Sequence, residues 1–172
     1  PKVWCNEGPV VKALRRDFAI PMGKTHTVEF AFGAVGVTGN WPSPRNPWDA
    51  IHHRACGGSS AGAGVSLAEG SAVIALGTDT GGSVRIPASV TGQVGLKSTI
   101  GRWSTAGIVP LSSSFDTPGT LTRTVEDTIT AFAVIDPAWD DVEEFYHQAG
   151  GLEASDLHLA VPDELFWDDC SP

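Results

Sequence analysis

Serines and glycines with a distinctive spacing are the residues of this chain best suited to chemistry. The run "CGGSSAGAGVSLAEGSAVIALGTDTGGSVRIP", residues 56–87, contains eight of the chain's 20 glycines and only three charged side chains. Because glycine has no Cβ, its backbone can approach a ligand closely, and successive N–H groups can surround a negative charge. A phosphate group and the oxyanion of an acyl-transfer reaction are the two anions that this composition suggests.

Known phosphate-binding patterns do not fit this sequence. The P-loop pattern G-x-x-x-x-G-K-[ST] would need a glycine at Phe18, ahead of the "GKT" at residues 23–25. The dinucleotide pattern G-x-G-x-x-G would need its third glycine at Leu67, after Gly62 and Gly64. The oxyanion interpretation is therefore favoured.

An oxyanion site needs a nucleophile beside it, and the segment "TDTGGS", residues 78–83, provides one. Ser83 follows two glycines at the end of an expected buried strand. Its Oγ would lie where the backbone N–H groups of Thr80, Gly81, Gly82 and Ser83 converge into an oxyanion hole. Serine also requires a base, and no histidine falls in a recognisable partner motif; the histidines are His26, His52, His53, His147 and His158.

A second serine offers an alternative nucleophile. Ser60 is the centre of "GSSAG", residues 58–62, which satisfies the G-x-S-x-G pattern of the α/β-hydrolase nucleophile elbow. That elbow requires an apolar strand directly before it, and the preceding "AIHHRAC" is typical of a loop. The alternative is kept open but is less favoured.

Strands and helices are expected to alternate around these serines. The apolar spacing and the turn residues predict an α/β fold with a central mixed, mostly parallel sheet flanked by helices. In the helix expected at residues 124–135, Thr124 is the N-cap and Asp127 the capping acid. The other expected elements are helices at residues 8–18, 25–32 and 59–70, strands at 19–25, 72–79 and 93–98, a long ordered loop at 33–58, and a strand leading into a helix at 157–166.

Composition narrows the classes of partner and compartment. The net charge is −9, all eleven Lys and Arg precede residue 124, and residues 136–172 carry eleven acids. Nucleic acids and anionic membranes prefer basic surfaces, so neither is expected as a partner. Cys5, Cys56 and Cys170 form no metal-binding or disulfide pattern, which predicts free thiols in the cytoplasm, no metal and no cofactor.

Taken together, the two serine motifs resemble the amidase signature family. The resemblance rests on "GGSSAGAG", residues 57–64, followed by "ALGTDTGGSVRIPASVTGQVGLKSTIGR", residues 75–102, and extends from Gly8 to about Asp168. Ser59 and Ser83 are 24 residues apart, as the corresponding serines are in that family.

This resemblance implies a Ser, cis-Ser, Lys mechanism. Ser83 would be the nucleophile, and Ser59 would be the bridging serine, preceded by a cis peptide bond from Gly58. The residues implied as supporting the site are Ser60, Asp79 and Arg85.

The family's catalytic lysine has no counterpart here. Lys24 is only 35 residues ahead of Ser59 and matches the family's "GKT" segment, whereas Lys2 lacks the expected surroundings. Residues 1–172 are therefore expected to be part of a single amidase signature domain that lacks its N-terminal, lysine-bearing portion and its C-terminal portion. The isolated chain is expected to be inactive.

The predicted function is hydrolysis of a small-molecule amide through a serine acyl-enzyme. The oligomeric state is not predicted, and a homodimer is left open. One alternative is the glutaminase component of the enzyme that acts on misacylated tRNA, but Ile86 stands where that component usually has Gln. A second alternative is a non-catalytic scaffold of the same fold.

Overall fold

The computed structural model describes residues 6–139, 141–151, 153–163 and 168. The chain divides into two compact units at residue 142. The first unit contains the serine motifs, and each unit is described by itself.

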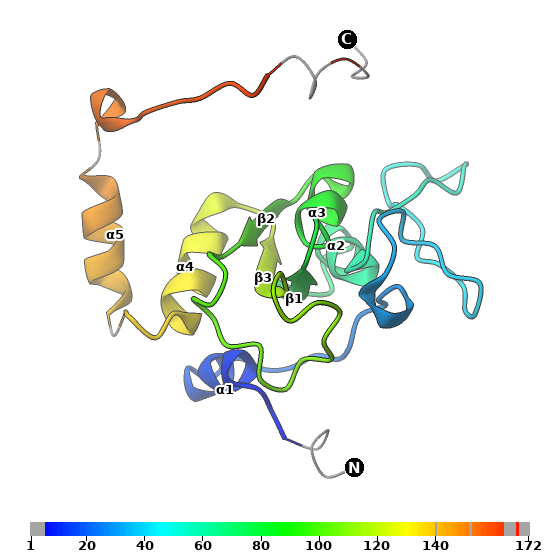
Figure 1. Ribbon diagram of the computed structural model, residues 1–172, viewed down its shortest axis with the longest axis horizontal. Coiled ribbons are helices and arrows are strands. Elements are labelled where there is room, and N and C mark those ends of the chain that lie inside the picture. The colour runs from blue at the N-terminus through cyan, green and yellow to red at the C-terminus, as the bar shows by residue number, and fades with distance from the viewer. Residues whose placement is uncertain (1–5, 140, 152, 164–167, 169–172) are drawn as a thin grey trace. The chain divides into compact units, whose positions relative to one another are not determined.

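A three-stranded sheet forms the centre of the first unit (Figure 1). It is made of β1 (Ile74–Asp79), β2 (Val94–Lys97) and β3 (Thr117–Thr122), in the order β1-β3-β2. Both pairings are antiparallel, so the expected mostly parallel sheet is not confirmed in the described residues. β1 and β2 nevertheless run in the same direction, because each is antiparallel to the strand between them.

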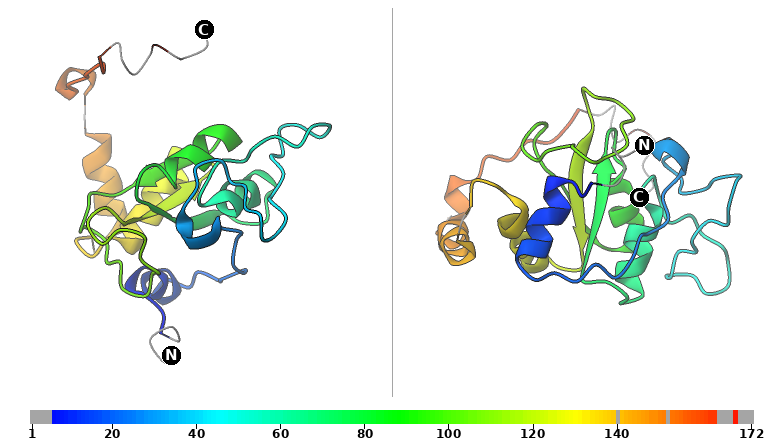
Figure 2. Two further views of the ribbon diagram at one scale, coloured as in Figure 1. Left: turned by 45° about the vertical axis from the view of Figure 1, so that its right-hand side comes forward. Right: turned by 90° about the horizontal axis from the view of Figure 1, so that it is seen from below.

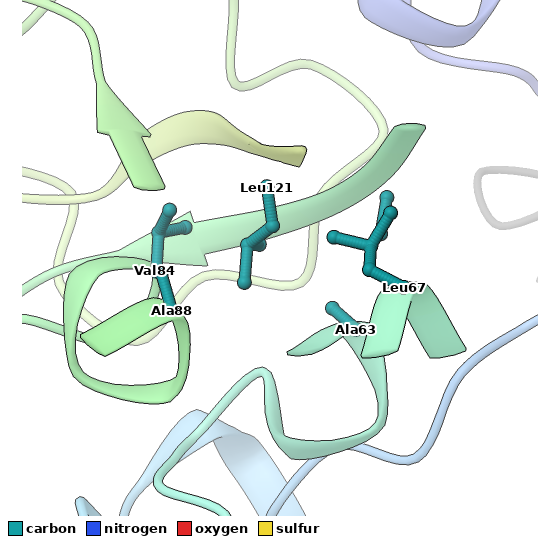
Figure 3. Close-up of a cluster of buried hydrophobic side chains, with 6 residues drawn as sticks. Ala63, Leu67, Val84, Ala88 and Leu121 are labelled. Carbon is teal, nitrogen blue, oxygen red and sulfur yellow. The ribbon is translucent and has the colours of Figure 1, made fainter. Parts of the chain in front are cut away.

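Helices cover both faces of this sheet (Figure 2). On one face, α2 (Ala61–Ala68) and α3 (Arg85–Thr91) pack against β1 and β3 through a cluster of buried side chains (Figure 3). Five members of this cluster are Ala63, Leu67, Val84, Ala88 and Leu121. The small residues of α2 allow close approach, because a Cβ on Gly64 would overlap the Thr91 hydroxyl.

The opposite face is covered by α1 (Pro9–Arg16) and α4 (Val125–Ile135). This second cluster contains Val10, Trp103 and Ile135 at its centre, and Leu14, Leu76, Leu96 and Phe132 around them. The cap predicted for α4 is confirmed, since Thr124 Oγ1 accepts a hydrogen bond from the Asp127 N–H at 3.1 Å.

Several expected elements are confirmed and several are wrong. The strands predicted at 72–79 and 93–98 and the helices predicted at 8–18 and 59–70 are present with shorter bounds. Residues 19–25 form no strand, and only the 3-10 turn η2 (Glu29–Ala31) replaces the expected helix at 25–32. Sequence reasoning missed α3 and β3.

The second unit is small. It contains most of α5 (Val142–Gly150) and the 3-10 turn η3 (Ala154–Asp156), neither of which was expected. Residues 157–163 form no strand, and the helix expected after them lies outside the described residues. Every described helix in either unit is too short or too polar to cross a lipid bilayer.

Candidate active site

Ser83 lies in the short connection between β1 and α3, partly buried. Its carbonyl oxygen accepts a hydrogen bond from the Ser60 N–H at 3.2 Å. This contact brings the two serine motifs together, although they are far apart in the sequence. The preceding residue, Gly82, has a φ of +128°, a backbone conformation that side chains with a Cβ rarely adopt.

Ser59 is fully buried immediately before α2. The Gly58–Ser59 peptide bond is cis, as the family resemblance implied. The Ser59 carbonyl accepts hydrogen bonds from the N–H groups of Val28 and Ala61, both at 2.9 Å. Its hydroxyl has no hydrogen-bond partner among the described residues, so this buried polar group is unsatisfied within them.

Gly58 is required by close packing. A Cβ at this position would overlap the carbonyl oxygen of Gly33 and would lie 2.8 Å from the nitrogen of Gly36. The loop around residues 33–36 therefore covers the backbone that carries Ser59. A larger residue at position 58 would push this loop away.

Ser60 is nearly fully buried, with 4% of its surface exposed, at the N-cap of α2. A Cβ on Gly77 of β1 would lie 2.5 Å from the Ser60 hydroxyl oxygen, so the strand packs directly against this side chain. Residues 52–58 form no strand. Ser60 therefore lacks the strand-turn-helix context of a nucleophile elbow.

The side chain of Asp79 stabilises the connection between β1 and α3 through hydrogen bonds. Its carboxylate is fully buried at the last position of β1. One oxygen, Oδ1, accepts from the Gly82 N–H at 2.8 Å and from Nη2 of Arg85 at 2.9 Å. The other, Oδ2, accepts from the Val84 N–H at 3.1 Å and from the N–H and Nε of Arg85 at 3.3 and 3.0 Å.

These contacts also set the charge state of the pair. Burial alone raises the pKa of Asp79, but hydrogen bonds from the Arg85 guanidinium and from two backbone N–H groups outweigh it, so the pKa lies below the usual value for Asp. The same pairing raises the pKa of Arg85. Asp79 is therefore ionised and neutralised locally by Arg85.

Two polar side chains near the site, Asp116 and Asn46, were not singled out from the sequence. Asp116 accepts a hydrogen bond from the Thr80 hydroxyl at 2.6 Å. Asn46 donates from Nδ2 to the Ala55 carbonyl at 3.0 Å and to the Val90 carbonyl at 2.8 Å, and so ties the long loop to the end of α3. Recognition of β3 would have placed Asp116 at its start, beside the end of β1.

The other basic groups considered from the sequence do not contact the serines through any hydrogen bond found in the described residues. Lys24 is exposed. The carbonyl of His26 accepts from the Gly62 N–H at 2.8 Å, but its ring Nε2 has no partner among the described residues, and burial lowers its pKa. His52 lies within 3.2 Å of Asp49 at the surface.

The described residues contain no group of three or more His, Cys, Asp or Glu that could hold a metal ion. Cys56 is buried and free, as expected for a small packed residue. Burial raises the pKa of its thiol. The polar groups in this region include hydroxyls, backbone N–H groups, the Asp79–Arg85 pair and the Asp116 carboxylate.

The sequence profile of the family described as Amidase matches residues 5–172. A 2-amino-5-chloromuconic acid deaminase of Comamonas testosteroni is 56% identical over 172 residues, which is 100% of this chain and 36% of the relative. A glutamyl-tRNA(Gln) amidotransferase chain of Nitratidesulfovibrio vulgaris (strain DP4) is 41% identical over 171 residues, 94% of this chain and 35% of that protein.

Several solved structures are also similar to this chain. A crystal structure of an amidase has a TM-score of 0.69 at 43% identity, covering 75% of this chain and 29% of the other. The 6-aminohexanoate cyclic dimer hydrolase in complex with its substrate has a TM-score of 0.71 at 35% identity, covering 76% of this chain and 27% of the other. The chain spans about a third of the length of the relatives it matches.

Proposed function

The chain belongs to the amidase family, and we propose that it is part of a longer protein that hydrolyses a carboxylic amide through an acyl-enzyme at Ser83. The observation that carries this proposal is the bond from the Ser60 N–H to the Ser83 carbonyl, which brings Ser83 to the segment of Ser59, whose buried hydroxyl has no partner in the described residues. A buried hydroxyl without a partner is costly, which supports a partner contributed by the rest of the protein.

In the proposed reaction, Ser83 Oγ attacks the amide carbon and its proton passes to Ser59. A C–O bond forms, and the carbonyl oxygen becomes an oxyanion. The C–N bond then breaks, the nitrogen leaves with a proton returned through Ser59, and water hydrolyses the ester to release the acid. The base that completes the relay is a lysine from the part of the protein beyond residues 1–172.

Backbone N–H groups of the β1–α3 connection would bind the oxyanion. The sequence suggested four donors, from Thr80, Gly81, Gly82 and Ser83. Because the Gly82 N–H donates to Asp79 at 2.8 Å, we propose the N–H groups of the other three as the oxyanion donors. Asp79 and Arg85 support the site by fixing this connection, and Ser60 supports it through its N–H bond to Ser83.

The relatives suggest a second candidate within C–N bond hydrolysis. The Comamonas testosteroni relative is named as a deaminase of 2-amino-5-chloromuconic acid, and it is more similar to this chain than the glutamyl-tRNA(Gln) amidotransferase chain is, at 56% against 41% identity. The alternative substrate class is therefore a small unsaturated amino acid with two carboxylates, from which hydrolysis would release ammonia. A tRNA-linked glutaminase is less favoured, because Ile86 replaces the expected Gln.

Covalent labelling of the full-length protein tests the nucleophile. A fluorophosphonate probe should modify Ser83, as mapped by mass spectrometry, and Ser83→Ala should abolish both labelling and ammonia release from amides. Ser60→Ala is the matched control and should still be labelled. Label on Ser60 with Ser83 unmodified would contradict the proposal.

The same preparation tests the relay. Ser59→Ala should lower kcat by about 10² to 10⁴ with a smaller change in KM, because proton transfer is lost while the substrate still binds. Near-normal turnover by Ser59→Ala would exclude the bridging role. Ammonia release from 2-aminomuconate, compared with simple amides, decides between the two substrate classes.

A further inference from the structure

A second buried carboxylate lies beside the connection that carries Ser83. Asp116 is 8% exposed and precedes β3, whose first residue, Thr117, is paired with Asp79 at the end of β1. The two carboxylates therefore lie at the same end of the sheet, Asp79 at the end of β1 and Asp116 directly before β3. Nothing in the proposed mechanism so far uses Asp116.

The two oxygens of Asp116 contact different segments. Oδ1 accepts from the Thr80 hydroxyl at 2.6 Å, whereas Oδ2 accepts from the N–H groups of Leu111 and Ser112 at 2.8 and 3.0 Å. One side chain thus joins the first residue after β1 to the loop that precedes β3. A short hydrogen bond to an ionised acceptor is stronger and more directional than one between neutral groups.

The contacts of Asp79 and Asp116 divide the β1–α3 connection between them. Asp79 fixes the later part, at Gly82, Val84 and Arg85. Thr80 is fixed by Asp116. Gly81, between them, has open space around its Cα, since a Cβ built there meets nothing within 4 Å. The orientation of the peptide groups around Gly81 therefore depends on both anchors.

We propose that Asp116 is a positioning residue that acts through Thr80 to orient the oxyanion-binding N–H groups. This inference rests on the proposed function, because it assigns a role in the same site. Neither side chain needs to contact the substrate. The role predicts a loss in kcat rather than in substrate binding, because the oxyanion exists only after attack.

Replacing Thr80 with valine removes the hydroxyl while preserving the branched shape. In the full-length protein, Thr80→Val should lower kcat by about 10- to 100-fold with KM changed less than about twofold, because a hydrogen bond to a charged group is lost and its effect is expressed in the transition state. Thr80→Ser keeps the hydroxyl and should restore most of the turnover. The matched control is Thr117→Val, which removes a hydroxyl whose one hydrogen bond within the described residues goes to the Phe115 carbonyl, at 3.0 Å, and should leave kcat within about twofold.

The outcomes separate this inference from the proposed function. If the wild-type protein turns over amides and depends on Ser83, but Thr80→Val stays within twofold of it, the positioning role is wrong and the nucleophile stands. A rise in KM at constant kcat would also overturn it, since Thr80 would then contact the substrate directly. A wild-type protein that neither turns over nor is labelled at Ser83 overturns the proposed function and this inference together.

Discussion

Replacing Asp79 with asparagine should destabilise the protein far more than its small change in shape suggests. All five hydrogen bonds to the carboxylate come from N–H donors, and the side chain is fully buried. An amide NH₂ group cannot accept any of them. The least costly orientation places the NH₂ at the position of Oδ1, where it faces the N–H of Gly82 and Nη2 of Arg85.

The expected cost follows from those two lost bonds. A hydrogen bond to a charged group contributes about 1.5 to 3 kcal/mol, so the loss of two amounts to about 3 to 6 kcal/mol. The Arg85 side chain is 54% exposed and can regain water, which brings the estimate to the lower end, about 3 kcal/mol. The free energy of unfolding from urea denaturation, at an unchanged m-value, measures it.

A pH series distinguishes this mechanism from simple misfolding. Because the pKa of Asp79 is depressed in the folded state, its charge stabilises the protein above the unfolded pKa of about 4, and this stabilisation is lost as the pH falls through the folded value. The difference between wild type and Asp79→Asn should therefore be full near pH 7 and shrink below about pH 4.

Asp49→Asn provides the matched control for the same substitution. Asp49 also accepts from an arginine, Nε of Arg54 at 2.9 Å, but its side chain is 22% exposed in a surface loop. Hydrogen bonds from the His52 N–H and from Arg54 also lower the pKa of Asp49, but exposure to water weakens them, so Asp49→Asn should give a smaller shift in stability at pH 7. Equal losses of unfolding free energy for the two substitutions would refute the reasoning. So would a difference in unfolding free energy between wild type and Asp79→Asn that does not change with pH.

Two further predictions concern the same connection and the chain as a whole. Gly82→Ala should lower the free energy of unfolding by about 1 to 3 kcal/mol, because the φ of Gly82 is +128°. Gly81→Ala should leave the stability unchanged, because a Cβ at that position meets no atom within 4 Å. Equal melting temperatures for the two variants would contradict this. Residues 1–172 expressed alone should show no Ser83-dependent amide hydrolysis on an aryl amide, and turnover should appear when the rest of the protein is restored in cis. Ser83-dependent turnover by the isolated chain would require a base within it, and Lys24 and His26 would be the first to mutate.

The sequence predicted the features of the fold and of the candidate site that depend on local spacing. The 24-residue separation of Ser59 and Ser83, the strand before Ser83 and the Thr124 cap all follow from residues close to one another in the chain. The cis bond at Ser59 followed from the family resemblance. Each of these features can be recognised without knowing which segments meet in space.

The missed elements lack the usual local signals in the sequence. The N-cap residue of α3, Val84, makes no side-chain capping bond. Instead, the N–H groups of Val84 and Arg85 donate to Asp79 at the end of β1, so the sequence contains no capping motif that predicts this helix. β3 contains Pro118 and Gly119 and is buried at all six positions, which removes the alternation of a half-exposed strand.

The strand expected at residues 19–25 failed for the opposite reason. Its apolar side chains suggested burial, but Ile20 is 80% exposed and Met22 is 78% exposed. Local hydrophobicity cannot show whether such residues are buried, because burial depends on contacts with distant parts of the chain.

The two carboxylates beside the Ser83 connection should respond differently to the same change, and the difference follows from their donors. Every donor to Asp79 is an N–H group, which can only donate, so asparagine leaves at least two of them unsatisfied. The donor to Oδ1 of Asp116 is the hydroxyl of Thr80, which can also accept. Asparagine at position 116 can keep its oxygen on the backbone N–H groups of the loop and donate from its NH₂ to Thr80, which preserves the link. Asp116→Asn should therefore retain much more turnover than Thr80→Val, and a kcat as low as that of Thr80→Val would mean that the charge of Asp116, rather than its connection to Thr80, is what the site requires.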